Sequence, residues 1–117
     1  MATRSFLINK NVTTQNSISA SLQTLSGNSQ TIEISGQVIR LDAGGSSRTG
    51  TILQKGHYSG QFIIVLNEGG ETVDTATEAT SHIAGAGGAT GFQPGLSYMF
   101  VWDSVNNLWS SAGNLLS

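Results

Sequence analysis

The chain has 117 residues and no cysteine, and its five basic and seven acidic side chains give a formal net charge of −2. This length fits one domain. The charges leave no basic stripe to neutralise phosphates, which argues against a nucleic-acid partner, and the lack of cysteine excludes disulfides and thiolate metal sites. The longest apolar runs have four or five residues, too few to span a membrane or to form a secretory signal.

Neutral polar residues dominate the composition. Only 10% of the residues are charged, whereas Ser, Thr, Asn, Gln and Gly together make up about half of the chain. Most of these residue types are unfavourable inside helices, because their flexibility or their side-chain hydrogen bonds compete with the helical backbone. The composition therefore predicts strands and turns.

The first eleven residues place three consecutive large apolar side chains between two of the five basic residues. Three adjacent apolar side chains favour burial, whereas chain ends are usually poorly ordered unless they pack against another part of the structure. We therefore expect residues 1–11 to form an extended N-terminal arm or an edge strand that packs on a neighbour, ahead of a single β domain at 12–117. The candidate partner contacts in this arm are Arg4, Phe6, Leu7, Ile8 and Lys10.

Alternation of apolar and polar residues predicts several short strands in the first half of the chain. Apolar side chains alternate with serines within residues 16–25, and a second alternating stretch spans 31–34. A Ser-Gly pair interrupts this pattern before it resumes at 37–41, which predicts a hairpin or a bulged strand. Residues 51–53 are expected to form another short strand.

Two stretches carry the strongest core signal. Five consecutive apolar residues at 62–66, rich in branched and aromatic types, predict a central strand buried on both faces. Residues 72–76 are expected to return as its partner after a tight turn. A second buried strand is predicted at 98–102, and the turn after it contains two asparagines, which tolerate the left-handed backbone that a hairpin back to 108–109 requires.

Short strands thus recur every 8–12 residues with turns between them, and no helix of ten or more residues is expected. This pattern predicts an all-β fold, a single-domain antiparallel β-sandwich or small β-barrel. No internal repeat of fixed period is visible in the sequence.

The two histidines and a group of four acids are the candidate catalytic or metal-ligating groups. His57 and His82 lack the spacing of a nucleophile elbow or a two-histidine metal motif, so we interpret both as turn or surface residues. The acids lack the spacing of a calcium loop and lie among Gly and Thr, which favours a solvated, edge-protecting group over paired catalytic carboxylates. These acids are Glu68, Glu71, Asp74 and Glu78.

Two further features have both a binding and a structural interpretation. Residues 84–91 are glycine-rich, but no P-loop lysine and no helix follow them, which indicates a flexible loop. Half of the aromatic residues lie near the C-terminus. If their rings were exposed, they would be able to stack on sugars. Three of them, however, share one face of a predicted strand, which favours a place in the core or in a subunit interface. These residues are Tyr98, Phe100, Trp102 and Trp109. We expect no catalytic site, metal or cofactor.

Three segments carry a resemblance. Residues 58–67 read Tyr-Ser-Gly-Gln-Phe-Ile-Ile-Val-Leu-Asn and 98–103 read Tyr-Met-Phe-Val-Trp-Asp, with Leu-Trp at 108–109. A Gly-Gln strand ending in Asn is followed by a Gly-rich acidic turn, a Ser/Thr-rich segment and an aromatic hairpin. This order resembles small β-structured virion proteins of tailed bacteriophages, found as capsid decoration (cement) proteins or as modules of tail fibres. The resemblance covers about half of the chain.

The resemblance implies a structural protein and not an enzyme. Decoration proteins commonly form trimers or dimers on the outer surface of the capsid, after synthesis in the host cytoplasm, and bind the major capsid protein partly through an extended terminal arm. Here Arg4 and Lys10 would meet acids of the capsid while the apolar residues between them fill a groove. The short chain favours a free-standing decoration protein over a long tail fibre.

Two alternatives stay open beside the decoration protein. A tail-fibre or baseplate module would recognise a host surface glycan and would expose aromatic residues for that purpose. A small binding module with no role in a virion would be absent from phage particles. The partners that we expect are the major capsid protein and further copies of this chain, with neither nucleic acid nor membrane.

Overall fold

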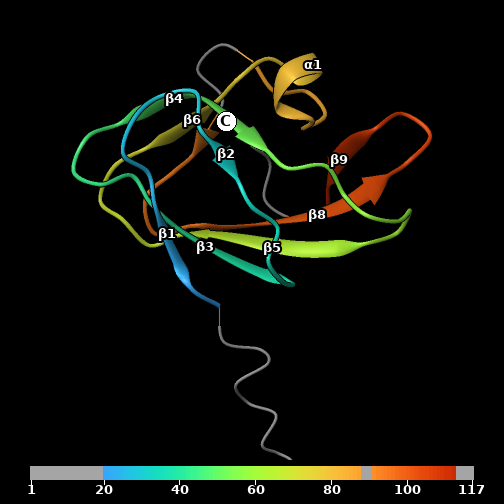
Figure 1. Ribbon diagram of the computed structural model, residues 1–117, viewed down its shortest axis with the longest axis horizontal. Coiled ribbons are helices and arrows are strands. Elements are labelled where there is room, and N and C mark those ends of the chain that lie inside the picture. The colour runs from blue at the N-terminus through green and yellow to red at the C-terminus, as the bar shows by residue number, and fades with distance from the viewer. Residues whose placement is uncertain (1–19, 88–90, 113–117) are drawn as a thin grey trace, which may run out of the picture.

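The computed structural model describes residues 20–87 and 91–112, and it confirms an all-β sandwich around one core. Two sheets face each other, and a single helical turn, α1 (Glu78–Ser81), lies at one end of the sandwich (Figure 1). The N-terminal arm predicted at 1–11, with all five of its candidate contacts, lies outside the described residues. The predicted boundary between arm and domain lies outside them too.

Nine strands in the described residues form the two sheets. The five-stranded sheet consists, in spatial order, of β1 (Leu22–Thr24), β3 (Val38–Asp42), β5 (Phe62–Asn67), β8 (Ser97–Asp103) and β9 (Leu108–Ser111). The four-stranded sheet consists of β2 (Thr31–Ile32), β4 (Arg48–Leu53), β6 (Val73–Thr75) and β7 (Gly91–Phe92). The short strands β2 and β7 lie at the two edges of the second sheet.

Successive strands alternate between the sheets. From β1 to β6, odd-numbered strands join one sheet and even-numbered strands the other, and every pair within this part is parallel. A parallel pair needs a long crossover connection, and here the strand of the opposite sheet is that connection. The chain therefore winds as a flattened coil. After β6 the direction changes, since β7 pairs antiparallel with β6 and β8 antiparallel with β5.

The strand directions differ from the antiparallel sandwich expected from the sequence, because both sheets are mixed. The hairpin or bulged strand predicted for 31–34 and 37–41 is wrong in both forms, since β2 and β3 belong to different sheets. The pairing predicted between 62–66 and 72–76 is wrong for the same reason. Period-two alternation reports which side of a strand is buried, and it carries no information on the neighbour with which the strand pairs.

The coil also explains why the sequence shows no repeat. Leu22 lies opposite Arg40, an offset of 18 residues, whereas Val38 lies opposite Ile64, an offset of 26 residues. Because successive turns of the coil differ in length, equivalent positions do not recur at a fixed spacing.

The predicted C-terminal hairpin is confirmed. Strands β8 and β9 pair antiparallel, and Asn107 in the turn has a φ of 56°, in the left-handed region. The Asp103 carboxylate stabilises this turn, because it accepts hydrogen bonds from the backbone N–H of Val105 (2.9 Å) and from the side-chain amide of Asn106 (2.7 Å).

Aromatic side chains fill the core between the sheets. The inward residues of β8 alternate as predicted, and the Phe92 ring packs edge-on against Tyr98 at 5.2 Å and Phe100 at 6.1 Å between ring centres. Trp102 and Trp109 face each other across the β8–β9 hairpin at 5.1 Å. All five rings are buried, so these four C-terminal aromatic residues are core side chains and the sugar-stacking alternative for them is wrong.

Asn67 joins the two sheets at the end of β5. Its side chain is fully buried, and its amide donates hydrogen bonds to the carbonyl oxygens of Glu71 (2.8 Å) and Phe92 (2.9 Å). Its own side-chain oxygen accepts the N–H of Gly69 at 3.1 Å. One side chain therefore satisfies three backbone groups where the chain leaves one sheet for the other.

Replacing this amide is expected to destabilise the fold. Asn67→Ala leaves two carbonyls and one N–H without their partner, and unpaired buried groups cost about 1–3 kcal/mol. We expect the free energy of unfolding, measured by urea denaturation, to fall by about 2 kcal/mol or more. Asn67→Asp keeps the shape but places a carboxylate against two carbonyl oxygens, so it should destabilise at least as much. A loss below about 0.5 kcal/mol in both variants, as at an ordinary surface site, would contradict this role.

Candidate functional site

The outward side of the five-stranded sheet is an apolar surface. Alternate residues of β3, β5 and β8 point away from the core, and no described element packs over them (Figure 1). Most of these side chains are apolar and half-buried. We name this surface the outer apolar face, and its residues are Val38, Phe62, Ile64, Leu66, Met99 and Val101.

Strand register makes the outer apolar face continuous. Ile64 lies opposite Val38 on one side and Met99 on the other, and Phe62 lies opposite Val101. The prediction that 62–66 is buried on both faces therefore needs correction, since the inward residues are fully buried and the outward ones only half-buried. Both sides of β5 are apolar, but the described chain covers only one of them.

The outward side of the four-stranded sheet is different. It carries Thr31, Ile52 and Asp74, a mixed and mainly polar set. The end of α1 also packs at this sheet, where His82 Nδ1 lies 2.8 Å from the carbonyl oxygen of Leu53. The contrast indicates that only one of the two outward sides has the composition of a protein contact.

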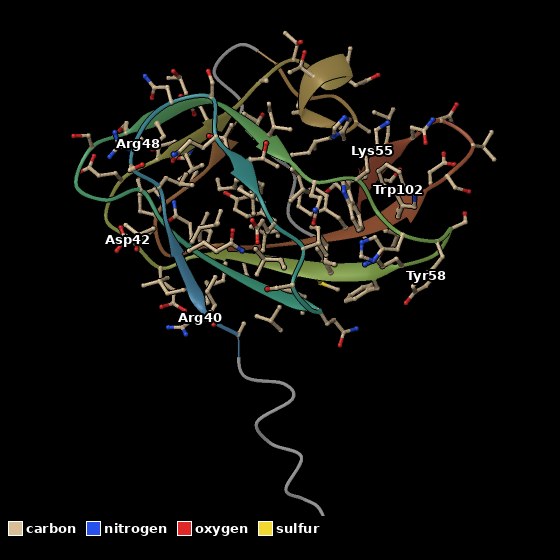
Figure 2. All side chains as sticks on the ribbon, in the orientation of Figure 1. Arg40, Asp42, Arg48, Lys55, Tyr58 and Trp102 are labelled. Carbon is tan, nitrogen blue, oxygen red and sulfur yellow. The ribbon has the colours of Figure 1, made fainter. Side chains whose placement is uncertain are left out.

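An arginine and a glutamate beside the outer apolar face neutralise each other. Arg40 lies on this side of the sheet (Figure 2) and forms a two-pronged pair with Glu68, in which Nη2 donates to Oε1 at 2.9 Å. The hydrogen bond between them raises the pKa of Arg40 and lowers the pKa of Glu68. Arg40 Nη1 also donates to the carbonyl oxygen of Ala20 at 2.7 Å, which fixes the chain ahead of β1.

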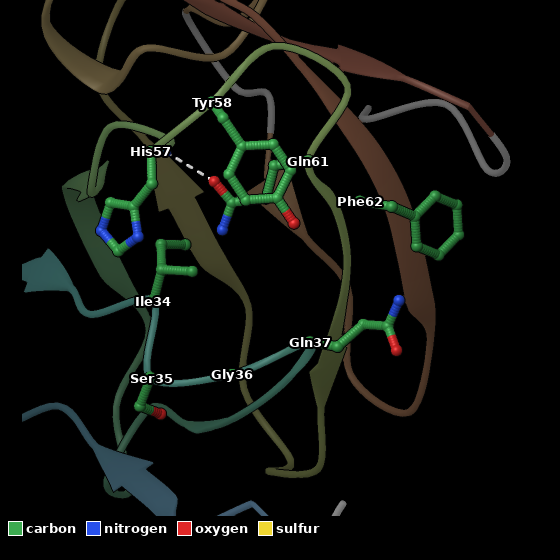
Figure 3. Close-up of a pocket in the computed structure, with 8 residues that line it drawn as sticks. All are labelled: Ile34, Ser35, Gly36, Gln37, His57, Tyr58, Gln61 and Phe62. Atoms are coloured by element: carbon green, nitrogen blue, oxygen red, sulfur yellow. Dashed lines mark hydrogen bonds between the residues drawn. The ribbon is translucent and has the colours of Figure 1, made fainter.

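A small pocket adjoins the outer apolar face at the N-terminal ends of β3 and β5. It is an open depression of about 320 Å³ between the β2–β3 connection and the β4–β5 loop (Figure 3). Phe62 belongs to both the pocket and the face. The residues that line the pocket are Ile34, Ser35, Gly36, Gln37, His57, Tyr58, Gln61 and Phe62.

The two histidines occupy separate structural roles. His57 is exposed in the β4–β5 loop, as predicted, and its backbone N–H donates to the side-chain oxygen of Gln61 at 2.6 Å. His82 ends α1 with a left-handed φ of 65° and contacts the Leu53 carbonyl. Neither imidazole contacts a serine hydroxyl or a carboxylate in the described part of the chain.

The four neighbouring acids do not form one site. Glu71 accepts a hydrogen bond from a serine hydroxyl at 3.4 Å, and Glu78 accepts the backbone N–H of Gly85 at 2.8 Å. Glu68 binds its arginine, and burial raises the pKa of Asp74 on β6. Each carboxylate therefore has its own partner or surroundings, although Glu68 and Glu71 share the β5–β6 connection.

Within residues 20–87 and 91–112, no three His, Asp or Glu side chains lie close enough together to hold a metal ion. No helix in this part of the chain is long and apolar enough to cross a membrane. Comparison of the sequence with models of known protein families gives no match, and comparison with curated proteins finds no similar chain. The functional argument therefore depends on the two surfaces, the outer apolar face and the pocket.

Sequence reasoning did not select either surface. The unbroken apolar run at 62–66 was the available signal for the outer apolar face, because a strand with one wet side normally alternates. The pocket has no comparable signal, since its two loops lie about twenty residues apart in the chain and meet through the parallel pairing of β3 with β5 and a hydrogen bond from the Ile34 N–H to the side chain of Gln54.

Stability is expected to fall in acid because two carboxylates are more acidic in the folded chain. Hydrogen bonds lower the pKa of Glu68, through Arg40, and of Asp103, through Asn106. A lowered pKa gives stabilisation that is complete above the unfolded-state values of about 4.3 and 3.9 and is lost as the pH falls through the folded-state values. Asp74, whose pKa is raised, acts in the opposite direction.

The midpoint of thermal unfolding should therefore decrease between pH 5 and pH 3. Glu68→Gln removes one of the two groups, so its melting temperature should depend less steeply on pH than that of the unaltered chain. An equal slope in the two proteins would show that the Arg40–Glu68 pair does not contribute.

Proposed function

We propose that this chain is a structural virion protein of a tailed bacteriophage, a capsid decoration protein whose copies associate through the outer apolar face. The observation that carries the proposal is the apolar outward side of the five-stranded sheet. The resemblance of the strand and hairpin segments to small virion proteins supports the same assignment. In this proposal the N-terminal segment, with Arg4 and Lys10, binds the major capsid protein.

A second copy of the chain fits the outer apolar face better than a charged partner does. The six residues of the face are uncharged, and Arg40 beside them is paired with Glu68 within the same chain. The outward carboxylates of Asp42 and Asp103, which have no basic partner among the described residues, lie at the C-terminal ends of β3 and β8, away from its centre at Ile64. A neutral, apolar surface is chemically self-complementary, as contacts between identical copies related by a two-fold axis require. Depletion of charge at the centre is also the compositional signal of protein interfaces.

The size of the face predicts weak association. Six residues of a strand span roughly 20 Å, and the three strands that carry the face together span roughly 14 Å. Each copy would thus contribute about a third of the ~800 Å² that one partner buries in a typical stable complex. Copies held side by side on a shell gain a high effective concentration, so a contact that is weak in solution suffices there.

A tail-fibre or baseplate module is the second candidate. It is favoured by the pocket at Tyr58, which carries an exposed aromatic ring. The two candidates differ in the number of copies per particle, because a decoration protein follows the many positions of the shell and a tail module does not.

The copy number per purified particle tests the proposal. Quantitative mass spectrometry against the major capsid protein should give hundreds of copies in a simple ratio to the shell protein, since decoration follows the symmetry of the shell. A few tens of copies or fewer would assign the chain to the tail. Absence from the particle would overturn both candidates.

Variants separate the two contacts of the proposal. Ile64→Lys places a charge at the centre of the outer apolar face and should weaken self-association, measured by sedimentation, by at least about tenfold, since burying an unpaired charge is unfavourable. Deletion of residues 1–11 should abolish binding to undecorated shells and leave self-association unchanged.

Val105→Lys is the matched control for the added charge, because Val105 is 85% exposed in the β8–β9 turn, away from the face. All variants should keep the far-ultraviolet circular dichroism of the unaltered chain. If Ile64→Lys lowers the melting temperature, the milder Ile64→Thr, which keeps a branched side chain, replaces it. Unaltered self-association in a folded face variant would refute the contact, and full shell binding by the deletion variant would refute the arm.

A further inference from the structure

The loop between β4 and β5 presents Tyr58 to solvent from a rigid support. Both tryptophans of the chain hold this loop. The indole N–H of Trp109 donates to the carbonyl oxygen of Gln54 at 2.8 Å, and the Trp102 ring lies so close to Gly56 that a Cβ there would overlap it. The conformation of the loop thus depends on contacts with two core side chains, although the tip of the loop lies outside the core.

Backbone hydrogen bonds fix the far end of the same loop. The N–H of Gly60 donates to the carbonyl oxygen of Trp102 at 2.9 Å, and the N–H of Trp102 donates to the carbonyl oxygen of Gln61 at 2.8 Å. The Gln61 N–H in turn donates to the carbonyl oxygen of Tyr58 at 3.1 Å. Despite these restraints, the Tyr58 side chain is 65% exposed (Figure 2). Because the backbone that carries the ring is already fixed, only the two side-chain torsions of Tyr58 lose freedom when the ring binds a ligand.

The pocket beside this ring is lined by hydrogen-bonding groups that the described chain leaves available. The hydroxyls of Ser35 and Tyr58 and the amide of Gln37 make no hydrogen bond within residues 20–87 and 91–112, and Gln61 uses only its oxygen there. Figure 3 shows these side chains around the opening, with the ring of Phe62 at one side. The volume of about 320 Å³ lies at the lower end of the range for small-molecule sites.

Charge excludes several ligand classes. No Lys, Arg, Asp or Glu lines the pocket, and its one ionisable base is the imidazole of His57. The pocket therefore offers no carboxylate to an amine and no arginine or lysine to a phosphate or carboxylate. Hydroxyls and amides both donate and accept hydrogen bonds, which matches a ligand rich in neutral hydroxyl groups. An exposed tyrosine ring supplies an apolar face with a polar edge, which suits the C–H face of a pyranose.

We propose that the pocket at Tyr58 binds one or two sugar rings of a neutral glycan. Tyr58 stacks on a ring, and the amides of Gln37 and Gln61 bind its hydroxyls. The site goes beyond the decoration function and does not depend on it, because the copy number and the outer-face variants can fail without affecting glycan binding.

Titration of the full chain with oligosaccharides, followed by amide NMR shifts, tests this site. The probes are neutral glucan, mannan, galactan and chitin oligosaccharides, with sialyllactose as an anionic comparison. At least one neutral probe should shift the resonances of Gln37, Tyr58 and Gln61 at millimolar concentration. No neutral probe binding, shifts confined to other residues, or binding of sialyllactose alone would each overturn the proposal.

Variants then identify the contacts. Tyr58→Ala should weaken binding by about tenfold or more, whereas Tyr58→Phe keeps the ring and should weaken it less. Val105→Ala, which truncates another exposed side chain, serves as the control and should bind as the unaltered chain does. Tryptophan fluorescence reports whether the loop still packs on Trp102. Unchanged affinity in a folded Tyr58→Ala variant would exclude stacking at this ring.

Discussion

The passage of the chain between two sheets is the constraint on which the rest of the structure depends. Each strand from β1 to β6 joins the sheet opposite that of its predecessor, so every connection must cross the sandwich at one of its ends. The polar backbone of these crossings needs partners, and the Asn67 side chain pairs with two groups of the β5–β6 crossing and with one carbonyl of β7. A parallel coil would continue indefinitely, and the antiparallel strands β7 and β8 end it on both sheets.

The sequence predicted which residues face the core far better than which strands pair. The alternation in 98–102 correctly placed Tyr98, Phe100 and Trp102 together, and two asparagines predicted the β8–β9 turn, because both signals are local. Pairing of β3 with β5 brings together residues 26 positions apart, and nothing in either strand alone specifies that partner. Assuming that neighbours in sequence form hairpins therefore gave the wrong directions in the coil.

For the candidate surfaces, too, the sequence predicted what depends on local signals and missed what depends on distant contacts. An unbroken apolar run at 62–66 is a local signal, and it correctly marked both sides of β5 as apolar, although the described chain covers only the inner side. Tyr58 has no such signal, because its exposure results from distant contacts, those of Gly56 with Trp102 and of Gln54 with Trp109. The N-terminal residues selected from the sequence lie outside the described chain, so their role stays a prediction.

The two proposed surfaces share Phe62 at their border but differ in chemistry and in where they are centred. The outer apolar face is centred on Ile64, where neutral apolar side chains from three strands meet. The pocket opens beyond the N-terminal end of β5, where Tyr58 projects from its loop and polar groups are available. A second copy centred on Ile64 removes water from apolar side chains, and their burial is favourable in free energy. The amides of the pocket lose hydrogen bonds when water leaves them, so they need a ligand that forms hydrogen bonds in its place. One surface therefore suits a like partner, and the other a hydroxyl-rich one.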